Sequence, residues 1–153
     1  MVSLERVFTG AQELLSTQLL DHQIMVNMDP SLKGTTVVGD AILVEQVLVN
    51  LLSNSCDAII ATGGKGEILI RKEKSTADQL VFSIIDTGIG LGNLEPERAF
   101  EPFVTTKDPS SGLGLGLSIS FNIITGMNGT LTLAARADVG TRATVTMPLG
   151  EKK

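Results

Sequence analysis

The sequence is 153 residues long, with 42% hydrophobic and 19% charged residues, a balance that excludes a disordered chain and suits one globular domain. Its net charge of −5 and its lack of Trp and Tyr exclude a general nucleic-acid binder, because there is no basic field and little stacking surface. The single cysteine, Cys56, cannot form an internal disulfide, as is usual in a reducing compartment. We find no signal peptide and no apolar run long enough to span a bilayer, so we expect a cytoplasmic domain without direct membrane contact.

The first half of the chain alternates helical and extended patterns. Apolar residues at three-and-four spacing predict a helix over residues 3–20, and alternating residues predict a short strand over 24–28. A long helix is expected over residues 40–60, with an aspartate as its N-cap and two glycines after its end. Two strands are then expected at about 66–73 and 79–86.

The second half begins with a segment that has no regular pattern. Residues 91–111 contain three prolines and no sustained period, and a structureless stretch of that length in a compact domain is typically functional. A helix is expected over about 114–125. The final hairpin, with strands over about 130–136 and 141–148, alternates apolar and polar residues.

This alternation decides the predicted architecture. Strands buried on both faces are continuously apolar, whereas the final strands keep one polar face of Thr and Arg, so helices cover only one side of the sheet. We therefore predict an α+β fold in a single domain over residues 1–153. It is a two-layer α/β sandwich whose mixed sheet is covered on one face by about three helices.

A polar stripe runs along the helix expected over residues 40–60. At about 100° per residue, Asn50, Asn54 and Asp57 fall within an arc of about 60°. Such a stripe of oxygen-bearing side chains can ligate magnesium. An ordinary solvated helix face is the competing interpretation, because polar stripes on amphipathic helices are routine. The opposite side, which would face the sheet, carries Leu48, Leu52, Ser55 and Ile59.

Asp86 ends a nearly continuous apolar strand and is followed by Gly88 and Gly90. A carboxylate at that position can accept a hydrogen bond from an exocyclic amine such as N6 of adenine. The glycines let the backbone turn sharply and approach a flat ring. Taken alone, a simple turn rich in Asp and Gly explains the segment equally well.

Gly112, Gly114 and Gly116 alternate with Leu113 and Leu115 where the next helix begins. Glycines there let phosphate oxygens approach backbone N–H groups, while the leucines anchor the loop. Alone, this motif is a weak indicator, since it lacks the preceding strand and the Lys of a P-loop. The fixed order of the three motifs along the chain nevertheless predicts a nucleotide pocket.

Together the motifs resemble the ATP-binding catalytic domain of bacterial sensor histidine kinases. That domain belongs to the GHKL superfamily (the Bergerat fold), which includes gyrase, mismatch-repair ATPases and anti-sigma-factor kinases. The resemblance covers residues from about 3 to 149. The matching segments are Asn50–Ala58 (N box), Asp86–Gly90 (G1 box), Phe100–Phe103 (F box), Gly112–Gly116 (G2 box) and Gly140-Thr141, with Asp57-Ala58 and Val104–Lys107 resembling the subgroup that has DA in the N box and FTTK after the F box.

The resemblance implies that the domain binds ATP and Mg²⁺. It implies that Asn54 binds magnesium with support from Asn50, and that Asp86 binds adenine N6 with Thr141 beside it through a water. Lys107 would neutralise the γ-phosphate and, with Asn50, forms the expected catalytic pair. The residues expected to bind the nucleotide are Asn50, Asn54, Asp57, Asp86, Gly88, Gly90, Thr106, Lys107, Gly112, Leu113, Gly114, Leu115, Gly116 and Thr141.

The segment between the G1 and G2 boxes is expected to be a lid over the phosphates. The resemblance makes Gly112–Gly116 its hinge and has Phe100 and Phe103 pack it. Ordinary core packing of the two phenylalanines is the competing interpretation.

The resemblance also implies partners. In the family, the phosphoacceptor histidine lies on a separate two-helix dimerisation domain, N-terminal to the catalytic one. The only histidine here, His22, lies just before the first expected strand, outside any long helix, and is not expected to be the acceptor. We therefore expect the dimerisation domain to be absent from this chain, and we expect it and a response regulator to be the partners.

The predicted function is transfer of the ATP γ-phosphoryl group to a histidine on that separate domain, a reaction that needs mainly positioning and charge neutralisation. A hydrolytic ATPase of the gyrase type is a competing hypothesis, but such enzymes carry Glu where this chain has Asn50, and an amide is no general base. A serine-kinase anti-sigma factor and a non-catalytic nucleotide-binding interaction module are two further hypotheses.

Overall fold

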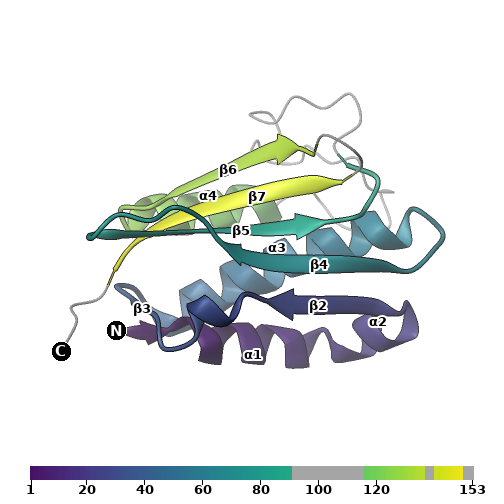
Figure 1. Ribbon diagram of the computed structural model, residues 1–153, viewed down its shortest axis with the longest axis horizontal. Coiled ribbons are helices and arrows are strands. Elements are labelled where there is room, and N and C mark those ends of the chain that lie inside the picture. Colours follow the sequence, from purple (N-terminus) through teal and green to yellow (C-terminus); the bar gives the residue numbers. More distant parts are fainter. Residues whose placement is uncertain (91–115, 137–139, 150–153) are drawn as a thin grey trace.

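The structure, a computed structural model, describes residues 1–90, 116–136 and 140–149 (Figure 1). Helices and strands are interspersed along the described chain. In chain order they are β1 (Val2–Ser3), α1 (Leu4–Leu14), α2 (Ser16–Asp21), β2 (Ile24–Met28), the 3₁₀ helix η1 (Pro30–Leu32), β3 (Thr36–Val37), α3 (Ala41–Ile60), β4 (Gly66–Lys72), β5 (Gln79–Asp86), α4 (Gly116–Gly126), β6 (Thr130–Ala135) and β7 (Thr141–Pro148).

The main sheet has five strands in the order β2-β4-β5-β7-β6. β2 is parallel to β4, and every other neighbouring pair is antiparallel, so the sheet is mixed as predicted. The register places Asp86 opposite Ile68 of β4 and Ile85 opposite Arg142 of β7. A separate pair of short strands, β1 and β3, joins the start of the chain to the segment before α3.

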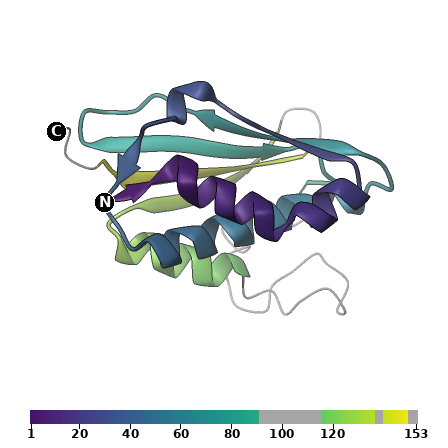
Figure 2. The same ribbon diagram turned by 90° about the horizontal axis from the view of Figure 1, so that it is seen from below.

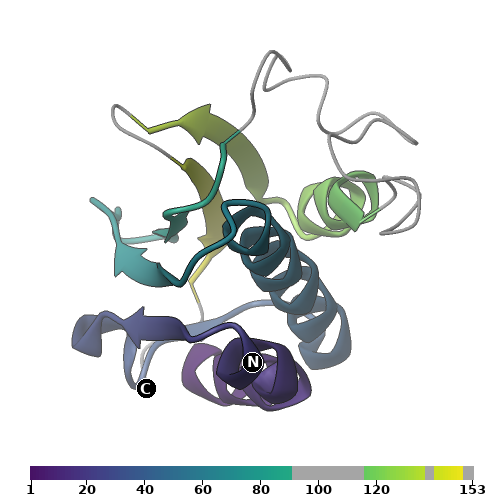
Figure 3. The same cartoon turned by 90° about the vertical axis from the view of Figure 1, so that its right-hand side faces the viewer.

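Helices cover one face of this sheet. Figure 2 shows α1, α3 and α4 side by side, and Figure 3 shows α3 lying between α1 and α4 against the strands. The prediction of a two-layer α/β sandwich with about three helices on one face is confirmed by the described residues. Among the described residues, the core is aliphatic apart from one edge-to-face pair, Phe8 of α1 and Phe82 of β5, whose ring centroids are 5.7 Å apart.

The central helix, α3, is capped by Asp40. Its Oδ1 atom accepts the backbone N–H groups of Ile42 (2.9 Å) and Leu43 (3.1 Å). By length and composition α3 could cross a membrane, although no such run was expected from the sequence. Its contacts are those of a core helix, however, because it packs on the sheet between α1 and α4. The buried residues include the four predicted to face the sheet: Leu48, Leu52, Ser55 and Ile59.

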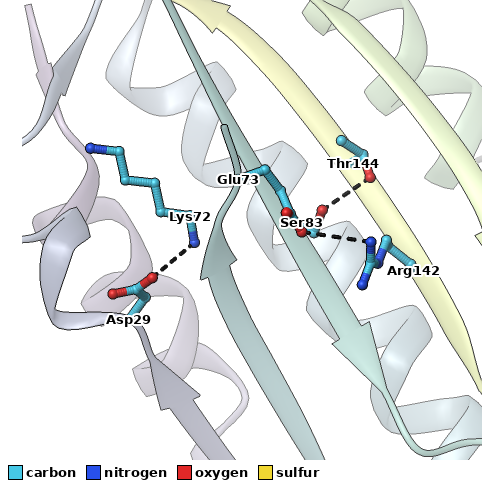
Figure 4. Close-up of polar contacts among 6 residues, drawn as sticks. All are labelled: Asp29, Lys72, Glu73, Ser83, Arg142 and Thr144. Atoms are coloured by element: carbon cyan, nitrogen blue, oxygen red, sulfur yellow. Dashed lines mark hydrogen bonds and ion pairs between the residues drawn. The ribbon is translucent and has the colours of Figure 1, made fainter. Parts of the chain in front are cut away.

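The other face of the sheet is polar, as its alternation predicted (Figure 4). The hydroxyls of Ser83 and Thr144 lie 3.0 Å apart between β5 and β7. The Arg142 guanidinium lies 3.8 Å from Glu73, which follows β4. These contacts give a layer of polar side chains where a third layer of helices would otherwise pack.

The N-terminal region differs from the prediction. The helix expected over residues 3–20 is divided into α1 and α2 at Leu15, whose backbone (φ −102°, ψ 6°) leaves the helical region. The Leu15 N–H is shared between the carbonyls of Ala11 and Gln12, a tightened last turn that lets α2 change direction. The two-residue strands β1 and β3 were not predicted, because two residues are too few to show alternation.

Candidate functional site

The centre of the candidate site is Asp86, at the end of β5. Its side chain is almost completely buried, with 4% of its surface exposed. The Oδ1 atom accepts the backbone N–H of Gly88 (2.9 Å) and that of Thr141 (3.3 Å). Asp86 and Thr141, which the resemblance places together, are thus in direct contact.

The electrostatics of Asp86 combine opposing effects. Burial raises the pKa of this carboxyl group, since removal from water disfavours the charged form. The hydrogen bonds from Gly88, Ser55 and Thr141, and the nearby charge of Arg136, oppose that rise because they favour the ionised form. An acidic group with this balance is typical of a functional site.

The turn after β5 is fixed against the last turns of α3. The N–H of Ile89 donates to the carbonyl of Ala58 at 3.0 Å. A Cβ atom added at Gly88 would lie 2.5 Å from the Ala58 Cβ and 2.6 Å from its carbonyl carbon, so only glycine fits there. Gly90 has a φ of +79°, which glycine adopts without strain. The Asp-Gly turn is therefore packed directly against the helix that carries the polar stripe.

Gly140 supports Asp86 from the opposite side. Its φ is +110°, and a Cβ there would overlap the main-chain carbonyl oxygen of Asp86. The same carbonyl oxygen accepts Nη1 of Arg136 at 3.0 Å. The backbone of Asp86 is thus held by Arg136, just after β6, and Gly140, just before β7, while its side chain points toward α3.

The polar stripe lies along α3 as predicted, and Asn50, Asn54 and Asp57 are all half-buried. Asn50 donates from Nδ2 to the Gly116 carbonyl (3.4 Å) and to the Ser120 hydroxyl (3.2 Å).

These two bonds connect the stripe to the first turn of α4, where the glycine motif ends. From Asn50 to Ala58 the helix rises by about 12 Å. One face of α3 therefore connects the start of α4 with the turn that follows Asp86.

Asp57 has a partner on α2. The side-chain amide of Gln18 donates to its Oδ1 atom at 3.2 Å. Gln18 belongs to the N-terminal part of the chain, which thereby contacts the stripe directly.

The oxygen-bearing side chains on α3 suit magnesium better than they suit a metal that is bound entirely by protein ligands. Among the described residues no group of three or more His, Cys, Asp or Glu side chains could hold an ion. Magnesium commonly needs only one or two protein oxygens and takes its other ligands from water and substrate phosphates. The amide oxygens of Asn50 and Asn54 and the Asp57 carboxylate are of this type.

Several predicted site residues lie outside the described residues. They are Phe100, Phe103, Thr106, Lys107, Gly112, Leu113, Gly114 and Leu115. The described residues bring together the N-box stripe, the Asp86 turn, Gly116 and Thr141.

Sequence reasoning missed three contributors to the site. Ser55 was assigned only to the core face of α3, yet its side chain lowers the pKa of the Asp86 carboxyl group. Arg136 and Gln18 reach the site from segments far away in the sequence. A serine among aliphatic residues on a buried helix face was the one available signal, because a buried hydroxyl requires a partner.

Comparisons with known proteins agree with this geometry. The family model described as "Histidine kinase-, DNA gyrase B-, and HSP90-like ATPase" matches residues 39–151. Two-component sensor PprA of Pseudomonas aeruginosa is 37% identical over 145 residues, which are 93% of this chain and 16% of PprA. The chain thus spans about a sixth of that relative's length.

Solved structures show the same fold. The catalytic domain of histidine kinase ThkA is 28% identical, with a TM-score of 0.76 over 95% of this chain and 94% of that one. ThkA in complex with the response regulator protein TrrA is matched at 26% identity, with a TM-score of 0.74 over 97% of this chain and 41% of that one. The mycobacterial sensor histidine kinase MprB, at 22% identity, has a TM-score of 0.80 over 97% of this chain and 96% of that one.

Proposed function

The chain belongs to the histidine kinase-, DNA gyrase B- and HSP90-like ATPase family, and we propose that it is the catalytic part of a two-component sensor histidine kinase. In this proposal it binds Mg-ATP and transfers the γ-phosphoryl group to a histidine on a separate dimerisation domain. Family and fold are those that the motifs predicted. The observation that carries the proposal is the buried Asp86, held at one end of a polar stripe that reaches the start of α4.

Adenine recognition is assigned to Asp86. Its buried carboxylate is an acceptor for the exocyclic N6 amine, and Thr141 stands beside it. Gly88 and Gly90 let the turn backbone lie close to the ring. A buried charged acceptor discriminates strongly, because a base without the amine leaves it unpaired.

The phosphate end is assigned to Asn50, Asn54 and Asp57 on α3, with Gly116 at the start of α4. Asn54 and Asn50 would hold Mg²⁺, which when bound neutralises phosphate charge. Thr106, Lys107 and Gly112–Leu115 are proposed to close over the phosphates, with Lys107 meeting the γ-phosphate. Such groups position the nucleotide and stabilise charge, while the nucleophile comes from the partner.

The acceptor histidine is proposed to come from the dimerisation domain. His22 lies at the C-cap of the six-residue helix α2 and is exposed, a setting without a long helix around it. The response regulator is proposed as the next partner, supported by the ThkA complex with TrrA. We place the domain in the cytoplasm, where the ATP it would use is available.

The test supplies a separately prepared dimerisation domain and labelled ATP. We expect acid-labile label on that domain's histidine, and ADP binding by this chain that requires Asp86. Lys107→Ala should slow the transfer while leaving ADP affinity nearly unchanged, because a cation at the γ-phosphate acts mainly on transfer.

Different results would overturn the proposal, and each would indicate a different function. Stoichiometric label on His22 would make this chain its own acceptor. Phosphate release at an equal rate without the acceptor domain would indicate a hydrolytic ATPase. Label on a serine of an added partner would indicate an anti-sigma kinase, and binding without transfer would indicate a nucleotide-binding module.

A further inference from the structure

Arg136 is a half-buried arginine just after β6, and both its backbone and its side chain are held in place. Its backbone N–H donates to the Gly140 carbonyl at 3.1 Å, one step beyond Ala135 and Thr141, the last pair of the β6–β7 ladder. Its Cδ atom lies 3.2 Å from the position that a Cβ atom would take at Gly140, so the side chain packs along that glycine. Its Nη1 atom donates to the main-chain carbonyl oxygen of Asp86 at 3.0 Å. The guanidinium therefore joins the end of the hairpin to the end of β5.

The Asp86 carbonyl lies where the regular ladder between β5 and β7 stops. The last regular pair of that ladder is Ile85 with Arg142. Asp86 and Thr141 would form the next pair, but the Thr141 N–H donates to the Asp86 side chain, 3.3 Å from Oδ1. Arg136 gives the carbonyl a side-chain N–H donor at this point. The carboxylate and the carbonyl of one buried residue are thus bonded to two different donors from the end of the hairpin.

The guanidinium suits this position in two ways. It carries N–H donors and no acceptor, so it can pair with a carbonyl oxygen, and it stays positively charged. Burial raises the pKa of the Asp86 carboxyl group, and the charge of Arg136 is among the effects that oppose this rise. An apolar side chain of similar length would supply neither the bond nor the charge.

We propose that Arg136 is a positioning residue for adenine recognition: its bond to the Asp86 carbonyl fixes the end of β5, and thereby the place at which the Asp86 carboxylate meets the exocyclic amine of an adenine nucleotide. This inference rests on the proposed function of Asp86. It adds to that function the residue that sets the position of the acceptor, from a segment about 50 positions away in the sequence.

The physical consequence is a loss of selectivity for the amine. Without the guanidinium, the Asp86 carbonyl loses a donor in a place with little access to water, and an unpaired buried carbonyl favours a changed backbone conformation. The carboxylate moves with the backbone of its own residue. Hydrogen bonds weaken steeply as their distance and angle depart from the optimum, so the bond to the amine weakens most. Contacts to the ribose and phosphates do not depend on this carboxylate.

The test measures affinity for two nucleotides by calorimetry at constant magnesium. One is ADP, and the other is the diphosphate of purine riboside, which lacks the 6-amino group. The two share their ring system, ribose and phosphates, so the ratio of their affinities isolates the interaction with the amine. A purely structural effect on the pocket would weaken both nucleotides together and leave this ratio unchanged.

Three variants are compared with the wild type. Arg136→Met keeps an apolar stem but removes the charge and the N–H donors. Arg136→Gln is polar and neutral and ends short of the Asp86 carbonyl, and it replaces Arg136→Met if that variant does not fold. Arg142→Met is the matched control, because it removes an arginine from the same hairpin whose guanidinium lies instead 3.8 Å from Glu73 (Figure 4).

We expect the wild type to prefer ADP over the analogue by about tenfold or more, the effect of a hydrogen bond to a charged group. In both Arg136 variants the preference should fall to about threefold or less, through weaker ADP binding, while affinity for the analogue changes by less than about twofold. Arg142→Met should keep the wild-type preference.

The outcomes separate this inference from the proposed function. A wild-type protein that bound both nucleotides equally would defeat the proposed role of Asp86 itself. A wild-type preference that persisted in the Arg136 variants would overturn the role of Arg136 and leave that of Asp86 standing. Equal losses of affinity for both nucleotides would make Arg136 a structural residue only. The same loss of preference in Arg142→Met would also overturn the inference, because any arginine of the hairpin would then have this effect.

Discussion

The two ends of the proposed nucleotide site, the proposed adenine end at Asp86 and the proposed phosphate end on α3, are built differently. At the adenine end, Asp86 is buried, its carboxylate is bonded to two backbone N–H groups, and Gly140 packs against its carbonyl. At the phosphate end, Asn50 and Asn54 are half-buried side chains on one face of α3, and Asn50 bonds to the first turn of α4.

Because of this difference, the geometry of the two ends depends on core packing to different degrees. The adenine end is part of the core, so its geometry is the geometry of the packed sheet and helix. The phosphate end consists of side chains projecting from a helix that would form without them. Substitutions at the adenine end should therefore affect binding and stability together unless they preserve shape, while those at the phosphate end should separate the two.

The largest expected effect is that of Gly140→Ala. A Cβ would overlap the Asp86 carbonyl oxygen, and a φ of +110° is strained for any other residue. We expect the free energy of unfolding to fall by about 3 kcal/mol or more and ADP affinity to fall with it. Urea unfolding and calorimetry measure the two quantities.

Gly126→Ala is the matched control, because the position has open space around a Cβ at the end of α4. Its unfolding free energy should change by less than about 1 kcal/mol. If Gly140→Ala behaved like this control, the adenine end would not depend on close backbone packing.

Asp86→Asn should reduce nucleotide binding without reducing stability, because the substitution preserves the shape of the side chain. The amide oxygen can still accept from Gly88 and Thr141, but the group cannot carry a charge. We expect ADP affinity to fall by about 1.5–3 kcal/mol, the cost of losing a hydrogen bond to a charged group, with an unchanged or raised Tm. A large loss of Tm in the variant would mean that the carboxylate is structural.

Asn50→Ala tests the phosphate end. The substitution removes the proposed magnesium ligand and the bonds to Gly116 and Ser120. We expect magnesium-dependent ATP affinity to fall by about tenfold, while ADP affinity in excess chelator stays near wild type. Asn122→Ala on the exposed side of α4 is the control. An equal loss of nucleotide affinity with and without magnesium would show that Asn50 acts only through its hydrogen bonds to α4.

The same contrast explains what could be predicted from sequence. Strands such as β5 and β7, the capped helix α3 and the stripe on it follow from local periodicity and were predicted nearly to the residue. The bond from the Ile89 N–H to the Ala58 carbonyl depends on how α3 lies beside the end of β5, which no local pattern contains. For the same reason Gln18 and Arg136 were missed, since each acts on a residue about 40 or 50 positions away.

The stability of the nucleotide-free domain should depend on pH through Asp86. Its pKa is raised in the folded state, so the folded protein binds the proton more tightly than the unfolded chain does. The contribution is present below the unfolded pKa of about 3.9 and is lost as pH rises through the folded pKa, by about 1.4 kcal/mol for each unit of difference.

Urea unfolding from about pH 4 to pH 7 checks this prediction. The unfolding free energy of the wild type should fall relative to that of Asp86→Asn as pH rises. A difference that stayed constant would show that folding does not shift the pKa of Asp86, and one that grew with pH would show that folding stabilises Asp86 as an anion.

The smallest expected effect is that of Gln18→Ala. Its amide donates to Asp57 at 3.2 Å between partly exposed groups, so the bond contributes about 0.5–1 kcal/mol at most. If the Asp57 carboxylate contacts bound magnesium or its waters, losing this donor changes Mg-ATP affinity by up to about threefold while ADP affinity in chelator is unchanged. Gln46→Ala, an exposed glutamine on α3, should change neither. A lower Tm with unaltered Mg-ATP affinity would make Asp57 the anchor of α2 on α3 and remove it from the phosphate end. In that case the phosphate end would consist of the two asparagines and the start of α4.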